Sequence, residues 1–113
     1  MDKIIERGLL FDFYGDLLTP HQQKIYSEAV FNDLSLAELS AEEGITRQGV
    51  HDLIKRCDKL MEGYEEKLKL VDKFQTIRKE VSNLSVLIDS SKGLEDNIRA
   101  DLKEGLKTII EEL

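Results

Sequence analysis

Apolar residues recur at intervals of three and four along most of this chain, and polar residues fill the positions between them. This spacing is typical of amphipathic α-helices. Helices are predicted over residues 2 to about 16, 20 to about 31, 36 to about 43, and from 47 onward. The abundance of Leu, Glu, Lys and Asp and the single proline also favour helices over a sheet. The predicted fold class is therefore all-α.

The second half of the chain repeats the same spacing over a greater length. From Met61 to Leu87 it predicts one long amphipathic helix with a kink near Gly63. A polar run at residues 90–93 interrupts this helix, and a last helix is predicted over residues 94–113. Two long helices with a short connection form an antiparallel hairpin.

A helix-turn-helix is predicted between Ser35 and Leu60. Ser35 and Glu38 have the spacing of a capping box, Gly44 suits the left-handed residue that ends a helix, and Thr46 can cap the next one. Six apolar residues are expected to lock the two helices together: Leu36, Leu39, Ile45, Val50, Leu53 and Ile54. The alternative interpretation is an ordinary helical pair without a ligand.

The second helix of this motif carries the candidate nucleic-acid contacts, which are Thr46, Arg47, Gln48, His51, Lys55, Arg56 and Lys59. Arg47 and Gln48 are long donors at the start of the helix, suited to phosphates and to base edges in a major groove. Lysine and arginine further along suit phosphates. Arg56 has an alternative partner in Asp52, one turn before it.

The net charge of −7 is unusual for a protein that binds nucleic acid, because such proteins are basic on at least one face. Any phosphate contact must form against a repulsive field, so non-specific affinity should be weak. An acidic balance also suits a basic protein partner.

The pattern divides the chain into a compact helix-turn-helix domain, residues 1–62, and the hairpin, residues 63–113. A hairpin of this length would leave apolar surface exposed on a monomer, so we expect a homodimer in which it is the dimerisation element. The alternative is that the hairpin folds back on its own N-terminal helices.

Enzyme signatures are missing from the sequence: it has no glycine-rich phosphate loop, no cysteine pair and no His-Glu-x-x-His motif. We therefore expect neither catalysis nor a metal or cofactor. Cys57, the single cysteine, shares the apolar face with Val50 and Leu53 and should be buried and inert. Phe11 and its aromatic neighbours could stack on bases, but beside leucines they are expected in the core.

A single cysteine fits a reducing compartment. The N-terminus lacks the apolar core of a signal peptide, and no apolar run has membrane-spanning length. We therefore expect a cytoplasmic protein.

Several segments resemble known families. Leu18-Thr19, Leu34-Ser35 and Gly44-Ile45-Thr46 are similar to elements of region 4 of bacterial sigma factors, whose second helix enters the major groove. The segments 11–23, 33–39 and 46–68 resemble the YlxM family of small bacterial helix-turn-helix proteins. Arg47 and Gln48 match that family's Ser/Thr-Arg-Gln turn, whereas Gly49 and His51 stand where an alanine-like residue and a tyrosine are expected.

The resemblance implies an all-helical protein of Firmicutes-type bacteria whose gene lies beside those of the signal recognition particle GTPases. It implies a role in that targeting pathway or in its regulation. Two hypotheses follow: a DNA-binding regulator, or an adaptor that binds the particle's RNA or GTPase without reading DNA sequence. A third is a structural dimer with a vestigial helix-turn-helix.

Overall fold

The computed structural model describes residues 2–113, which form six α-helices and one 3₁₀ turn and contain no strand. The elements are α1 (Lys3–Tyr14), η1 (Gly15–Leu17), α2 (Pro20–Val30), α3 (Leu36–Glu43), α4 (Arg47–Leu68), α5 (Leu70–Ser90) and α6 (Asp96–Glu111). The all-α prediction is confirmed. Contacts divide the chain into an N-terminal unit, Met1–Val71, and a C-terminal unit, Asp72–Leu113.

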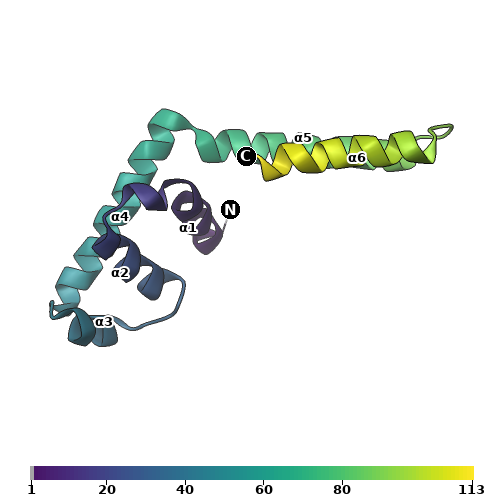
Figure 1. Ribbon diagram of the computed structural model, residues 1–113. Coiled ribbons are helices and arrows are strands. Elements are labelled where there is room, and N and C mark those ends of the chain that lie inside the picture. The colour runs from purple at the N-terminus through teal and green to yellow at the C-terminus, as the bar shows by residue number, and fades with distance from the viewer. Residues whose placement is uncertain (1) are drawn as a thin grey trace. The chain divides into compact units, whose positions relative to one another are not determined.

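In the N-terminal unit, α4 is the element against which α1, α2 and α3 pack (Figure 1). Tyr14, Tyr26, Cys57 and Met61 form the centre of one buried cluster. The ring of Phe11 stacks on that of Tyr26 with centroids 5.6 Å apart, which confirms that the aromatic residues belong to the core. The aromatic rings thus join α1 to α2 over the face of α4 that carries Cys57.

A second cluster forms where α3 meets α4. Leu39 and Val50 are fully buried there together with Ile25 of α2, and Ile45, Leu53 and Ile54 pack against them. Leu36, which was expected in this contact, is 36% exposed and is not part of the cluster. Ile25 takes that place because α2 crosses both helices of the motif.

The apolar spacing of the first helix predicts a buried face of Ile5, Leu9, Leu10, Phe13 and Leu17, and the face that α1 buries differs from it. Ile5 and Leu17 remain exposed, whereas Leu10, Tyr14 and Leu18 are buried. The α-helix ends at Tyr14, and the 3₁₀ turn that follows winds more tightly, so the buried side shifts toward Leu18.

Side chains cap the helix starts of the N-terminal unit. Thr19 and Gln22 form a full capping box, with Pro20 in the first turn. Ser35 accepts a hydrogen bond from the backbone N–H of Glu38 at 3.1 Å, which is one half of the predicted box. These side chains satisfy N–H groups that have no partner inside the helix.

A polar network ties α1 and α2 to α4. Asp58 accepts hydrogen bonds at 2.6 Å from the Arg7 guanidinium and at 2.6 Å from the Tyr26 hydroxyl. The hydrogen bond to Asp58 raises the pKa of Arg7. Burial, and then the same carboxylate, raises the pKa of Tyr26. Both donors therefore keep their protons, and Asp58 joins three helices.

The helix that begins at Arg47 continues unbroken through Gly63 and ends at Leu68, so the kink predicted at Gly63 is wrong. The break lies at Lys69, whose φ of 59° is left-handed. The division between the units falls after Val71, whereas the sequence-based boundary between residues 62 and 63 lies inside α4. No glycine or proline marks Lys69, so the pattern alone could not reveal this break.

Two side chains of the N-terminal unit provide hydrogen-bond partners for the start of α5. The Tyr14 hydroxyl donates to Glu65 at 2.6 Å and accepts from the backbone N–H of Leu70 at 3.2 Å. Glu65 accepts from the backbone N–H of Val71 at 2.9 Å. Burial is the main reason that the pKa of Tyr14 is raised. Free N–H groups of α5 are thus satisfied by residues of α1 and α4.

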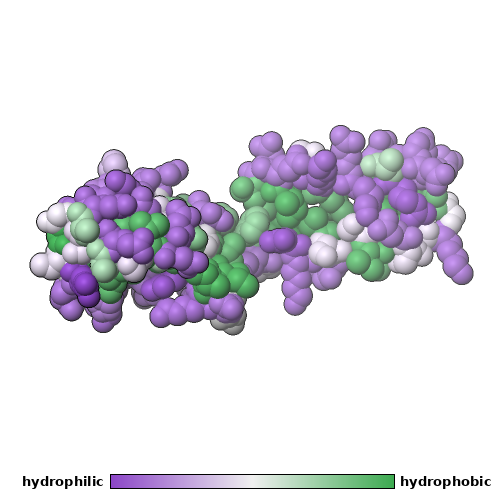
Figure 2. Space-filling model, turned by 90° about the horizontal axis from the view of Figure 1, so that it is seen from below, coloured by the Kyte–Doolittle hydropathy of each residue, from purple (hydrophilic) through white to green (hydrophobic). Residues whose placement is uncertain are grey.

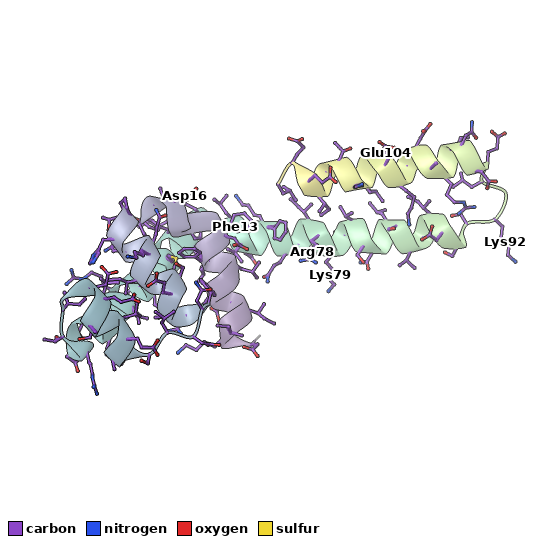
Figure 3. All side chains as sticks on the ribbon, turned by 60° about the horizontal axis from the view of Figure 1, so that its bottom comes forward. Phe13, Asp16, Arg78, Lys79, Lys92 and Glu104 are labelled. Carbon is purple, nitrogen blue, oxygen red and sulfur yellow. The ribbon has the colours of Figure 1, made fainter. Side chains whose placement is uncertain are left out.

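The C-terminal unit is an antiparallel pair, α5 and α6, joined by a loop that contains Gly93 with a φ of 80° (Figures 1 and 3). Lys103 donates to Ser85 Oγ at 2.8 Å and to Asp89 at 2.8 Å. The Arg99 guanidinium donates to the carbonyls of Ile88 and Ser91. Among residues 2–113, no helix has the length and apolarity needed to cross a membrane.

Candidate nucleic-acid interface

The turn between α3 and α4 has the geometry of a helix-turn-helix. Gly44 ends α3 in the left-handed conformation, with φ 68° and ψ 28°. Ser40 of α3 donates from its hydroxyl to the carbonyl of Ile45, and Thr46 then caps α4 by accepting from the backbone N–H of Gly49 at 2.9 Å. The turn is therefore held by glycine geometry and by two side-chain hydrogen bonds.

Every one of the seven candidate contact residues is exposed. Because successive residues of a helix are about 100° apart, Gln48, His51, Lys55 and Lys59 fall in one stripe along α4. Val50, Cys57 and Met61, on the opposite side, are buried. The structure thus places these four side chains together on the outer face of a helix whose inner face is fixed in the core, while Arg47 and Arg56 flank the stripe on opposite sides.

Asp52 lies within this stripe and already holds two of the candidates. Gln48 donates to Asp52 at 2.9 Å, and the His51 imidazole lies 3.8 Å from the same carboxylate oxygen. The described residues show these partners for Asp52 and not the alternative with Arg56. All three side chains are exposed, so Gln48 can exchange Asp52 for another acceptor at little cost.

A local steric constraint accounts for glycine at position 49. A Cβ at this position would lie 3.1 Å from Thr46 Oγ1, the atom that caps the helix. An alanine here would gain helix propensity, about 1 kcal/mol, but would crowd the cap. Glycine costs helix stability and leaves the Thr46 hydroxyl undisturbed.

The charge changes along the outer face of α4. Lys55, Arg56 and Lys59 are cationic, whereas Glu62 and Glu66 in the next turns are anionic. The segment from Arg47 to Lys59 spans about 18 Å at the rise of an α-helix. Only this N-terminal half of α4 is suited to a polyanion.

An acidic cluster that the sequence did not reveal lies between α2 and α3. The carboxylates of Glu28, Glu42 and Glu43 approach within 4.8 Å of one another. Lys24 pairs with Glu43 at 2.9 Å, and this hydrogen bond lowers the pKa of Glu43. The His21 imidazole lies 3.5 Å from the same residue. Part of the acidic charge near the turn is therefore neutralised within the protein.

Asp58 likewise offsets less of the positive charge of α4 than the sequence alone suggests. By sequence it counts against the cations of the helix, but its carboxylate is held by Arg7 and Tyr26 and is only 17% exposed. Its role was not recognisable, because its partners lie 51 and 32 residues away. Asp52 is therefore the exposed acid among the candidate cations.

The α3–α4 turn and the exposed face of α4 make this a helix-turn-helix protein, with a helical hairpin attached. The family model described as "Putative helix-turn-helix protein, YlxM / p13 like" matches residues 1–102. The chain therefore belongs to this family, UPF0122, as the resemblance to YlxM indicated.

Relatives from the same family cover most of the chain. A UPF0122 protein of Shouchella clausii is 40% identical over 95 residues, which is 84% of this chain and 87% of the relative. A UPF0122 protein of Bacillus cereus is 38% identical over 109 residues, 96% of each chain, and one of Bacillus anthracis gives the same values. No solved structure matches.

Proposed function

We propose that this chain is a nucleic-acid-binding regulatory protein that contacts duplex DNA with the N-terminal half of α4. The observation that carries the proposal is the exposed stripe of Gln48, His51, Lys55 and Lys59, flanked by Arg47 and Arg56, on a helix whose other side is buried at Val50, Cys57 and Met61. A helix presented in this way can enter a major groove, with the preceding helix of the motif crossing the sugar-phosphate backbone. Membership of a helix-turn-helix family and the similarity to sigma region 4 support the same interpretation.

The candidates divide into two roles. Arg47 and Gln48 stand in the first turn of α4 and reach for base edges, where arginine pairs with guanine and glutamine with adenine. Lys55, Arg56 and Lys59 hold phosphates, and His51 adds a contact between the two groups. Thr46 places the first turn by capping it. Base contacts specify the sequence, while phosphate contacts fix the orientation.

The test is a selection from random duplexes followed by binding measurements on the enriched sequence across a salt series. Arg47→Ala and Gln48→Ala should lose preference for that sequence. Lys55→Ala and Lys59→Ala should weaken binding to all duplexes, and each should reduce the slope of log affinity against log salt by about 0.9.

Lys67→Ala is the matched control, because Lys67 is an exposed cation in the last turn of the same helix, beyond Glu62 and Glu66. It should leave the salt slope and the preference unchanged. Enrichment that does not exceed background, or an equal loss with Lys67→Ala, would refute DNA reading by α4. Unchanged binding of every partner after Arg47→Ala and Gln48→Ala would favour a structural role with a vestigial motif.

The second candidate function is that of an adaptor for the signal recognition particle, which the resemblance to YlxM implies. The observation that favours it is the net charge of −7, since the GTPase of the particle has a positively charged RNA-binding domain. Binding to the purified RNA, to the GTPase and to their complex at low salt tests this candidate. Absence of binding to all three removes it. Either function places the protein in the cytoplasm.

A further inference from the structure

The C-terminal unit has no buried core of its own. Between Asp72 and Leu113, no residue of either helix is buried, and the contact side of α6 carries Arg99 and Lys103 beside Leu106 and Ile110. The unit is close to the length of about 40 residues below which isolated domains usually need a disulfide, a metal or association. To be stable, the unit must therefore bury further surface against something outside itself.

An apolar face lies on one side of this unit, formed by Leu84 and Leu87 of α5, by Ile98, Leu102 and Ile109 of α6, and by Leu113 just beyond its end. Their exposed fractions run from 43% for Ile98 to 61% for Leu87. On α6, this strip is displaced by about 90° from the residues that contact α5. On α5, Leu84 and Leu87 are displaced in the same rotational sense from the residues that contact α6. Because the two helices run antiparallel, a displacement in the same sense about each helix axis places both strips on one side of the pair.

The other side of the same unit is a groove with hydrophilic rims. It has a volume of about 650 Å³ and is lined by Arg78, Ser82 and Val86 of α5 and by Ala100, Glu104 and Lys107 of α6, among others. Figure 2 shows hydrophobic side chains in the hollow between two hydrophilic rims, and Figure 3 shows Arg78 and Glu104 on opposite helices. None of the six residues of the apolar face lines this groove.

We propose that the apolar face is covered by the same face of a second copy of this chain, so that two hairpins form a four-helix bundle. The hairpin is about 24 Å long over the 16 residues of α6 and about 20 Å wide, which gives a footprint of roughly 480 Å², more than half of the ~800 Å² that each partner of a standard interface buries. The six residues of the face are all aliphatic, so the contact requires no charged partner. Pairing of identical faces about a twofold axis is the commonest way in which such surfaces are buried.

Gly105 adds an independent observation. It lies in the middle of the α6 strip, between Leu102 and Ile109, and a Cβ at this position would meet nothing within 4 Å. Neither its φ nor a contact within the chain requires glycine there, and glycine in a helix interior is unfavourable. In a face-to-face bundle, this position lets an opposing side chain approach the α6 backbone.

The test measures the mass of the full chain in solution by light scattering or sedimentation, without nucleic acid, over a range of concentrations. The wild-type chain should have twice its mass of 13.0 kDa. Leu102→Glu should give a monomer. Val86→Glu is the matched control, because Val86 is 64% exposed on the groove side, more than any residue of the apolar face, and its substitution should leave the dimer intact.

Gly105→Leu provides a second variant that adds no charge and favours the helix. Overpacking of a well-fitted contact should weaken dimerisation by about tenfold or more while circular dichroism shows unchanged helix content. A monomeric wild-type chain at all concentrations, or dissociation by Val86→Glu and not by Leu102→Glu, would overturn the proposal. Because no DNA is present, this result is independent of whether α4 binds DNA.

Discussion

Replacement of Asp58 by alanine should destabilise the N-terminal unit by about 3 kcal/mol. The substitution leaves the Tyr26 hydroxyl, on a residue with no exposed surface, without its acceptor. An unsatisfied buried polar group costs roughly 1–3 kcal/mol, and a hydrogen bond to a charged partner contributes about 1.5–3 kcal/mol. Arg7 contributes less to the loss, because 25% of its side chain is exposed and can turn to water.

Tyr26→Phe divides this effect into its parts. It removes the donor instead of the acceptor, so no hydroxyl is left unpaired, and the expected cost is about 1.5–2 kcal/mol. In the double variant the unpaired hydroxyl no longer exists. The two single effects should therefore exceed the double effect by about 1–2 kcal/mol.

The assay is urea denaturation followed by tyrosine fluorescence. The chain has no tryptophan, and its three tyrosines, Tyr14, Tyr26 and Tyr64, all lie in the N-terminal unit, so the signal reports on that unit alone. Asp52→Ala is the matched control on the same helix. Its side chain is 65% exposed, so the substitution should change the free energy of unfolding by no more than about 0.5 kcal/mol. Equal costs for Asp58→Ala and Asp52→Ala, or simple additivity with Tyr26→Phe, would refute the network.

Three further predictions concern the motif and its core. Gly44→Ala should lower the free energy of unfolding by about 1 kcal/mol, because a φ of 68° is unfavourable for a residue with a Cβ. Gly63 lies inside a helix with open space around it, so Gly63→Ala should raise the free energy of unfolding by about 0.5–1 kcal/mol in the same denaturation assay. Thr46→Ala should cost about 1 kcal/mol and Thr46→Ser much less, because serine keeps the cap; equal losses would contradict the capping role. Burial raises the pKa of Cys57 from 9.0 to about 11, so the folded state holds this proton more tightly, and up to about 2–3 kcal/mol of stability should be lost as the pH rises from 9 to 11. Cys57→Ala should flatten that alkaline loss, and an unchanged slope would show that the thiol does not titrate there.

The helix-turn-helix could be predicted from the sequence because its capping and turn signals involve residues close together in the chain. Ser35, Gly44 and Thr46 act through hydrogen bonds or dihedral angles within a few residues of themselves, and the structure shows each in the expected position. The capping box of Thr19 and Gln22 is local in the same sense, since its hydrogen bonds join residues three apart. Such features need no knowledge of distant packing.

The features that sequence reasoning missed depend on contacts between distant segments. Lys69 adopts a left-handed conformation that residues with a Cβ rarely enter, and nothing in its neighbours indicates this. Ile25 completes the α3–α4 contact from another helix, and Asp58 finds its partners in α1 and α2. Periodicity assigns a residue to the apolar or polar side of a helix but does not identify the segment that packs there.

The hydrogen bonds at the start of α5 also bear on recombination between relatives. Leu70 and Val71 find their acceptors on Tyr14 and Glu65, so α5 begins on groups that the C-terminal unit does not carry. A chimera joined between residues 62 and 63 would take Tyr14 from one parent and Glu65 from the other. A crossover after Val71 would instead take Tyr14, Glu65 and both backbone donors from one parent. The hairpin is therefore exchanged between family members with least disturbance at the division between the units, whereas a junction at residues 62 and 63 requires that the second parent also carry an acceptor at position 65.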